Sequence, residues 1–349
     1  MSGRSVAGPA PARPAAPAAG RTAGPGAVDC RRVAAVTTRV AAIDCGTNSI
    51  RLLVADLPDT DAGPEAPLVD LSRRMEIVRL GQGVDKTGRL APEAIERTRV
   101  ALASYAADID KLGAERIRMC ATSASRDAAN AADFREMVER TLGVAPEVVT
   151  GDEEARLSFT GAVRGLPADA PEPFLVIDIG GGSTEFVVGT RTGGVEAAVS
   201  MDIGCVRMTE RHLHGDPPSL DEIAAAQADI GVAVDRALEV VPGREAATLV
   251  GLAGSVTTVV AIAEGLQEYD PARIHHARVS YEAVAEVTAD LLGKTREQRL
   301  AIPVMHPGRA DVIGAGALVL RVIMERAGMP SVVASEHDIL DGIAWSLQP

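Results

Sequence analysis

An internal repeat constrains this chain more than any other feature of its sequence. A shift of 134 residues places Ile43–Gly46 on Ile177–Gly180 with the Ile-Asp and Gly positions identical, and Ser49 on Ser183. In each copy an apolar strand ends at an aspartate, a glycine-containing turn follows, and a second β-rich strand begins. Two equivalent hairpins so far apart in the chain predict two lobes of similar design.

Short β-rich runs alternate with helical ones from Val40 onward, which predicts an α/β fold. The expected strands are Val40–Asp44, Ile50–Ala55, Met75–Leu80, Ile117–Ala121, Glu147–Thr150, Phe174–Asp178, Glu185–Gly189, Thr248–Gly251 and Ser331–Ser335. The expected helices are Ala91–Leu112, Asn130–Leu142, Asp152–Arg164, Leu220–Val241, Ser255–Glu264, Tyr281–Leu292, Ala310–Ala327 and Ile339–Leu347. We expect an N-terminal lobe over residues 40–165 and a C-terminal lobe over residues 172–349, joined by a Pro- and Ala-rich linker.

Residues 1–39 are a low-complexity mixture of Ala, Pro, Gly and Arg, and we expect a disordered tail there. This segment holds six arginines and one acid, so the other 29 basic and 47 acidic side chains give the remainder a net charge of −18. A body this acidic offers no general basic face to nucleic acid, and eight aromatic residues provide no platform for stacking bases. An anionic substrate would therefore need local donors and metal ions.

The chain has no apolar run near the eighteen residues that a membrane span requires, and its N-terminus lacks the apolar stretch of a secretory signal. We therefore expect a cytoplasmic protein with no membrane partner. The four cysteines are scattered without a Cys-x-x-Cys pair, which favours neither a disulfide framework nor a zinc site.

The segment Ile177–Glu185, with three consecutive glycines, is the most informative in the sequence. Glycines let the backbone turn tightly and direct several N–H groups at one oxygen-rich ligand. A dinucleotide fingerprint is excluded, because Glu185 stands where its third glycine belongs and the following residues alternate like a strand. A plain glycine-rich hairpin remains the alternative for this segment alone.

The partner segment, Ile43–Ser49, supplies hydroxyl and amide donors in place of two glycines. We expect the two hairpins to face each other across a cleft and to cradle phosphate groups. The strand-end aspartates, Asp44 and Asp178, would then position hydrated Mg²⁺, which keeps its waters and needs only one or two carboxylates.

Three further segments carry candidate site residues. Gly151–Ala155 bunches three carboxylates before a helical run, which fits ordinary helix-start chemistry or a base that activates water for attack on phosphorus. The Ala121–Arg126 strand end suits a phosphate contact or an ordinary cap. The turn at Gly254-Ser255 fits anion binding at a helix N-terminus or tight packing.

Together these segments resemble the exopolyphosphatase/guanosine pentaphosphate phosphohydrolase family of the actin and sugar-kinase superfamily. The resemblance rests on IDCGTNS, ATSASRDA, GDEEA, IDIGGGSTE, IGCVRMTE and GLAGS, in that order from about residue 40 onward. It implies two ribonuclease-H-like (actin-like) lobes with the site in the cleft between them, which agrees with the internal repeat.

The resemblance implies that Glu154 is the catalytic base, that Glu185 is a second essential glutamate, and that Asp44 and Asp178 are associated with Mg²⁺. Arg126 corresponds to an arginine that contacts polyphosphate. The phosphate-binding residues expected from the segments above are Gly46, Thr47, Asn48, Ser49, Arg126, Gly181, Gly182, Ser183, Thr184, Gly254 and Ser255.

Two departures from the family pattern are visible. Longer members append an HD-type helical region that this sequence lacks, which leads us to expect better performance on short polyphosphates. Many members also have Arg-Glu-Gly where this chain has Leu340-Asp341-Gly342, so a phosphate contact by that arginine is lost or supplied elsewhere.

We expect the chain to hydrolyse the terminal phosphoanhydride of polyphosphate and release orthophosphate, as a homodimer. One alternative is the same chemistry on guanosine pentaphosphate. A second is a non-catalytic polyphosphate or nucleotide sensor, against which the presence of both Glu154 and Glu185 argues. A sugar or acetate kinase would leave GDEEA without a purpose.

Overall fold

Two β-sheets carry the fold, and each is built around one of the repeated hairpins. The computed structural model describes residues 3, 8, 38–58 and 68–348. The first sheet contains β1 (Thr38–Cys45), β2 (Ser49–Leu57), β3 (Val69–Ile77), β4 (Arg116–Ala121) and β5 (Glu147–Val148). The second contains β6 (Phe174–Ile179), β7 (Thr184–Thr190), β8 (Gly194–Met201), β9 (Thr248–Leu252), β10 (Arg278–Ser280) and β11 (Ser331–Ala334).

Five strands of each sheet follow the same topology, which confirms the predicted α/β class with two ribonuclease-H-like lobes, and the second sheet adds β10 at its edge. The strand orders are β3-β2-β1-β4-β5 and β10-β11-β9-β6-β7-β8. In the first sheet β1 pairs antiparallel with β2 and parallel with β4. In the second sheet β6 pairs antiparallel with β7 and parallel with β9. The repeat read from the sequence is therefore a repeat of topology.

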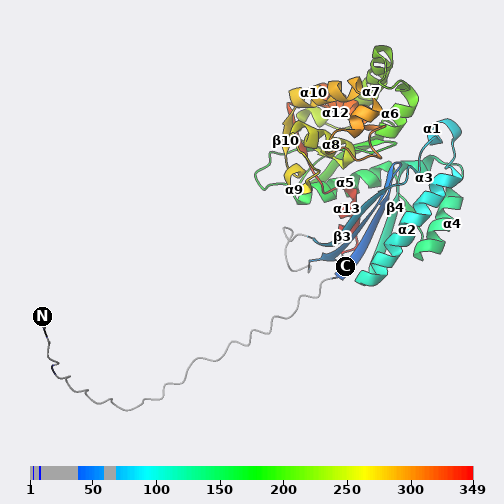
Figure 1. The fold of residues 1–349 in the computed structure, drawn as a ribbon, viewed down its shortest axis with the longest axis vertical. Helices are drawn as coiled ribbons and strands as arrows, with labels where there is room; N and C mark the ends of the chain where they lie inside the picture. Colours follow the sequence, from blue (N-terminus) through cyan, green and yellow to red (C-terminus); the bar gives the residue numbers. More distant parts are fainter. Residues whose placement is uncertain (1–2, 4–7, 9–37, 59–67, 349) are drawn as a thin grey trace. The chain divides into compact units, whose positions relative to one another are not determined.

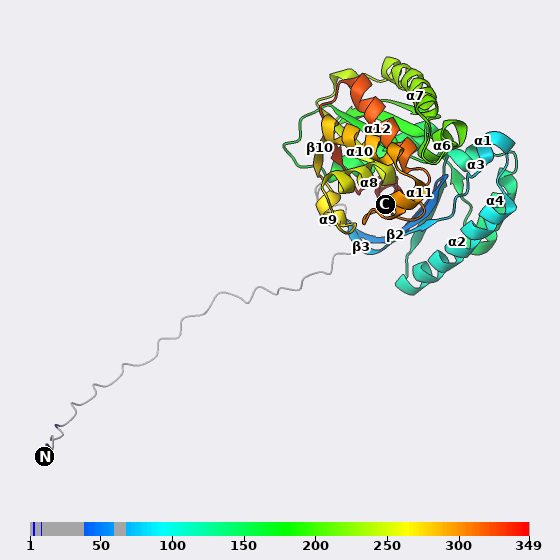
Figure 2. The same cartoon turned by 45° about the horizontal axis from the view of Figure 1, so that its top comes forward.

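The helices cover the outer faces of the sheets and fill the space between them. They are α1 (Val84–Thr87), α2 (Pro92–Leu112), α3 (Ser123–Asp127), α4 (Ala131–Leu142), α5 (Gly151–Arg164), α6 (Cys205–His212), α7 (Leu220–Val240), α8 (Ala253–Ala263), α9 (Pro271–Ile274), α10 (Tyr281–Gly293), α11 (Arg296–Leu300), α12 (Ile313–Ala327) and α13 (Ile339–Trp345), with a short 3₁₀ turn at Gly243–Glu245. Figures 1 and 2 show α2 and α4 side by side on the first sheet, and α7, α10 and α12 grouped on the second. No helix in the described part of the chain is long and apolar enough to cross a membrane.

Helices α5 and α13 pack against each other through two glycines. A Cβ on Gly161 would lie 1.9 Å from the carbonyl oxygen of Asp338, and one on Gly342 would lie 2.0 Å from that of Leu157. Only residues without a side chain allow so close a crossing. Helix α13 also packs on β1 and β2, and α5 packs on β7 and β8, so this helix pair joins the two sheets (Figure 1).

Several expected element boundaries differ from those in the structure. Strand β1 begins at Thr38 rather than Val40, because Thr38 and Arg39 pair with Leu57 and Asp56 in the hairpin. Strand β3 covers Val69–Ile77 rather than Met75–Leu80. The expected strand Glu147–Thr150 keeps only two strand residues, since Thr150 becomes the N-cap of α5 and accepts the Glu153 N–H at 3.2 Å.

Strand β8 and helix α6 were not expected from the sequence. Strand β8 carries small and mixed side chains that give no clear period, and the eight-residue α6 follows a loop at Gly204. Apart from Gly3, Gly8 and the first two residues of β1, the predicted tail over residues 1–39 lies outside the described residues. The lobe boundaries stay a prediction. The sequence-based boundary assigns α13 to the C-terminal lobe, but in the structure this helix packs on the first sheet.

Candidate active site

The turns of the two repeated hairpins meet. In the first turn the Gly46 N–H donates to the Ser49 carbonyl at 2.9 Å, and in the second the Gly180 N–H donates to the Ser183 carbonyl at 3.0 Å. A Cβ on Gly181 would lie 2.8 Å from the Thr47 Cβ, so the turns touch directly. The equivalent residues of the repeat therefore make equivalent bonds on the two sides of one cleft.

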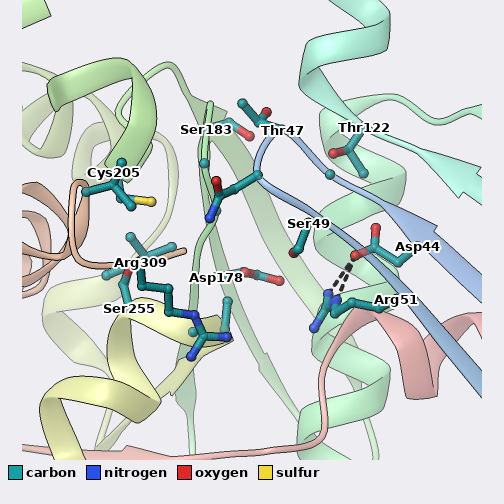
Figure 3. Close-up of a pocket in the computed structure, with 18 of the residues that line it drawn as sticks. Asp44, Thr47, Ser49, Arg51, Thr122, Asp178, Ser183, Cys205, Ser255 and Arg309 are labelled. Carbon is teal, nitrogen blue, oxygen red and sulfur yellow. Dashed lines mark hydrogen bonds and ion pairs between the residues drawn. The ribbon is translucent and has the colours of Figure 1, made fainter. Parts of the chain in front are cut away.

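A polar pocket lies at this junction (Figure 3). Its volume of about 90 Å³ suits a phosphate group and is too small for a nucleoside. The expected site residues that line it are Asp44, Gly46, Thr47, Asn48, Ser49, Glu154, Asp178, Gly181, Ser183, Gly254 and Ser255. Eleven residues from four separate segments of the sequence therefore come together at one pocket.

Asp44 is buried at the end of β1 and is held by Arg51. Both Nε and Nη2 of Arg51 donate to the same oxygen, Oδ2, at 2.9 and 2.7 Å, while Nη1 donates to Asp338. Figure 3 shows the Arg51–Asp44 bonds at the edge of the pocket. Burial raises the pKa of Asp44, and the Arg51 charge opposes that rise. The Oδ1 atom accepts neither of the Arg51 bonds.

Asp178 is the next-to-last residue of β6, on the other side of the cleft, and its carboxylate has no arginine bound to it within the described residues. Its Oδ2 accepts a hydrogen bond from the Ser158 hydroxyl at 2.8 Å. Burial, with the charges of Glu185 and Asp338, raises the pKa of Asp178 to about 8, against weaker opposition from Arg51 and Ser158.

Glu154 lies in the first turn of α5 with its side chain 10% exposed. Burial raises the pKa of Glu154 well above its usual value, and the nearby Glu185, Asp178 and Asp44 add to the effect. Arg126 opposes it from a distance of 3.5 Å between Nη1 and Oε2. A carboxylate with a raised pKa at the wall of a phosphate-sized pocket has the character of a general base.

Four expected site residues do not line the pocket. Arg126 reaches the Val149 carbonyl at 3.1 Å and acts on the pocket through Glu154. Glu185 is fully buried and accepts a hydrogen bond from the Ser200 hydroxyl at 2.7 Å. Burial raises the pKa of Glu185 to about 7.

The other two lie in the second hairpin. The Thr184 hydroxyl donates to the Ile203 carbonyl at 2.7 Å, which leaves it no proton for a ligand. The Gly182 carbonyl accepts the Arg207 Nε–H at 2.7 Å. Both residues shape the turn that presents Gly181 and Ser183.

Arg309 is a pocket residue that the sequence analysis missed. It precedes α12, lines the pocket beside Gly254 and Ser255, and donates to the Thr258 hydroxyl at 3.2 Å (Figure 3). A Cβ on Gly254 would lie 2.2 Å from its Cζ, so this glycine leaves space for the guanidinium. No carboxylate lies within ion-pair distance of Arg309 among the described residues. Nothing in the local sequence distinguishes Arg309 from other surface arginines.

Arg51, Thr122 and Cys205 also line the pocket and were not expected there. Leu340, at the family's arginine position, is buried instead in the core around α13. Arg51 and Arg309 thus supply the positive charge at this cleft. The position of Arg51 could have been predicted from the hairpin register, because Arg51 is the residue of β2 that pairs directly with Asp44 of β1.

The carboxylates fit a divalent ion held largely by substrate and water. Among the described residues, no three His, Cys, Asp or Glu side chains converge as a ready-made metal cage. Mg²⁺ is commonly held by one or two carboxylates together with phosphate oxygens. Asp44 and Asp178 both line the pocket, and the raised pKa of each reflects buried negative charge that a cation would stabilise.

A two-lobed α/β protein with glycine- and hydroxyl-rich turns facing each other across an acidic cleft is built to handle phosphoryl groups. Residues 59–347 match the Ppx/GppA phosphatase family, and the chain belongs to this family. Exopolyphosphatase 2 of Mycobacterium tuberculosis is 54% identical over 319 residues, covering 89% of this chain and 98% of the relative.

Solved structures agree with this membership. An exopolyphosphatase-like protein of known crystal structure shares 43% sequence identity with this chain. The two structures superpose with a TM-score of 0.85, covering 89% of this chain and 98% of that one. The crystal structure of an Aquifex aeolicus member of the Ppx/GppA family is 31% identical, with a TM-score of 0.74 over 89% of this chain and 97% of that one.

Proposed function

We propose that this chain is an exopolyphosphatase that hydrolyses the terminal phosphoanhydride bond of inorganic polyphosphate and releases orthophosphate. The observation that carries the proposal is the placement of Glu154 on the wall of the phosphate-sized pocket formed by the two hairpin turns. The 54% identity with a protein named exopolyphosphatase 2 supports the same substrate. A sensor without catalysis would have no need of a buried base at this position.

The hairpin turns would bind the terminal phosphate through backbone N–H groups and the hydroxyls of Thr47 and Ser49. Glu154 would accept a proton from water as the water oxygen bonds to the terminal phosphorus. The anhydride P–O bond breaks, and its electron pair leaves on the oxygen of the shortened chain. Arg309 would stabilise the negative charge that gathers on the phosphoryl oxygens.

Mg²⁺ is the cofactor that we propose for this site, with Asp44 and Asp178 as the residues that would hold it. When bound, it would neutralise phosphate oxygens and bring a polyanion into an acidic cleft. Arg51 supports this role, because it occupies Oδ2 of Asp44 and thereby fixes the orientation of the carboxylate. The expected homodimer and cytoplasmic location stay predictions.

A second candidate substrate is guanosine pentaphosphate, and one observation favours it. A larger cavity of about 540 Å³ adjoins the phosphate pocket and shares Arg51, Gly254 and Arg309 with it. Its lining combines apolar side chains such as Val304 and Met305 with polar and charged ones, including Tyr269, Glu336, Arg73 and Arg74. The sequence contained no visible base reader, whereas this cavity has the volume of a nucleoside site, with apolar surface beside its charged groups.

One assay separates the two substrates. Phosphate release is measured from short polyphosphate, long polyphosphate, guanosine pentaphosphate and ATP at identical Mg²⁺. We expect the highest kcat/KM on polyphosphate. A value on guanosine pentaphosphate well above both polyphosphates would replace the first proposal with the second, and turnover of none of them would overturn both.

A further inference from the structure

A second pocket, separate from the active site, lies beside the C-terminal half of α5 and the turn between β7 and β8. Its volume is about 350 Å³, and it shares no lining residue with the phosphate pocket. Three arginines line it, Arg156 and Arg164 from α5 and Arg191 from the turn. In a chain of net charge −13, three arginines around one pocket are a concentrated positive site.

The two α5 arginines lie on the same broad side of the helix, because residues eight apart are separated by little more than two turns. Arg156 forms an ion pair with Asp152 at 3.0 Å, in which both side chains are more than half exposed. Such an exposed pair is weak and leaves the guanidinium accessible to another anion.

Arg164 and Arg191 have no carboxylate partner for their side chains within the described residues. The Arg164 guanidinium lies over the Trp345 ring, 4.0 Å from its centroid, and partial burial lowers its pKa. The Arg191 guanidinium donates to backbone carbonyls of the linker, Leu166, Pro167 and Ala168. Glu172 is close, but it accepts the backbone N–H of Arg191 at 3.2 Å.

The floor of this pocket is apolar, formed by Phe159, Val163 and Val195. The Phe159 ring fits a notch at Gly189, where a Cβ would lie 2.8 Å from its Cζ. An apolar floor displaces water and strengthens charge-assisted hydrogen bonds made above it. Arginine forks match phosphate oxygens two at a time.

We propose that this arginine pocket binds a phosphate-bearing anion at a site distinct from the active site. Orthophosphate carries one to two negative charges near neutral pH on several acceptor oxygens, so it can engage two guanidinium groups at once. The inference goes beyond the proposed hydrolysis and does not depend on it, since binding here requires no turnover. The same helix carries Glu154 in its first turn and the arginines in its later turns.

The chain has one tryptophan, Trp345, and it lies under Arg164, which makes its fluorescence a local probe. We would titrate the full chain with orthophosphate and with AMP, with chloride at matched ionic strength as the reference. Neither ligand contains a phosphoanhydride bond, so a failure of the proposed hydrolysis would not affect the result. We expect a saturable fluorescence change that chloride does not produce.

Arg156→Gln should weaken the affinity at least about tenfold without touching Trp345. Arg164→Gln should do the same, measured by calorimetry because it alters the fluorescence itself. Arg135→Gln is the matched control, an exposed arginine in a similar i,i+4 ion pair on α4, and should leave the affinity unchanged. Equal affinities for the two ligands identify free phosphate as sufficient, and tighter AMP binding identifies a nucleotide. Absence of saturation, or unchanged affinity in both pocket variants, overturns the proposal.

Discussion

Arg51 and Glu185 occupy equivalent positions in the two repeated hairpins, each paired across the strands with the aspartate that ends the first strand. Arg51 pairs with Asp44 and Glu185 pairs with Asp178, 134 residues further along. One aspartate therefore has a cation as its cross-strand neighbour and the other has a carboxylate. The two hairpins thus share the same backbone pairing but differ in the charge of the side chain opposite the aspartate.

Replacing Arg51 by Gln should strongly destabilise the fold. The substitution removes the cation between two buried carboxylates, Asp44 and Asp338, and loss of one partner of a buried pair costs about 3–5 kcal/mol. The free energy of unfolding from denaturant titration measures this. Arg39→Gln in the same hairpin is the control, because the Arg39 side chain is one-third exposed and its pair with Asp56 should contribute much less. Equal losses in both variants would contradict a special role for Arg51.

Replacing Glu154 by Gln should lower kcat at least about 100-fold while leaving polyphosphate binding largely intact. The carboxylate acts on water, and removing its charge eases the approach of a polyanion. Glu153→Gln is the matched control, since the neighbouring Glu153 is nearly half exposed and pairs with Arg118. Phosphate release and binding are measured on the same preparations. Near-normal release from Glu154→Gln would exclude it as the base.

The α/β class and the paired hairpins could be read from the sequence because both depend on local pattern. The strand-end aspartates and the glycine turns lie next to each other in the chain, and the 134-residue repeat fixes their pairing. The turn residues Thr47 and Gly181 were therefore predicted, and the structure brings them into contact.

The remaining features depend on contacts between distant segments. Arg309 reaches the pocket only because Gly254 leaves space for its guanidinium, and α13 reaches the first sheet only through the glycine crossing with α5. The expected phosphate contact of Thr184 gives way to a bond with Ile203, a partner that no local pattern indicates. Strand β8 lacks the alternation that identifies a half-buried strand.

Phosphate release should require a divalent ion, and Asp44→Ala and Asp178→Ala should each reduce it at least about 100-fold. The body of the chain carries a net charge of −18, so a polyanion meets repulsion at this cleft unless cations offset it. Activity is measured in excess chelator and again after Mg²⁺ is added back. Full activity in chelator would show that the two aspartates serve some other purpose.

The metal-free protein should lose stability as the pH rises from 6.5 to 8. In the folded state the pKa of Asp178 is raised to about 8 from an ordinary value of 3.8, so the folded chain holds a proton that the unfolded chain releases. Stability therefore falls as pH rises through the folded pKa, at on the order of 1 kcal/mol per pH unit for one group. His275, whose pKa is lowered to about 3 by burial, acts in the opposite direction near pH 6.5, because only the unfolded chain binds a proton there, and this contribution fades by pH 8.

Asp178→Asn removes this group, and its amide oxygen can still accept the Ser158 hydrogen bond. Glu154 and Glu185, whose pKa values are also raised, contribute in the same direction and keep part of the slope in the variant. Its free energy of unfolding, measured in chelator at pH 6.5, 7, 7.5 and 8, should fall less steeply than that of the unmodified chain. Mg²⁺ should flatten the slope of the unmodified chain by stabilising the charged carboxylate. Asp235→Asn, in a surface ion pair on α7, should keep the original slope. Identical slopes for Asp178→Asn and the unmodified chain would mean that Asp178 is already ionised at pH 6.5.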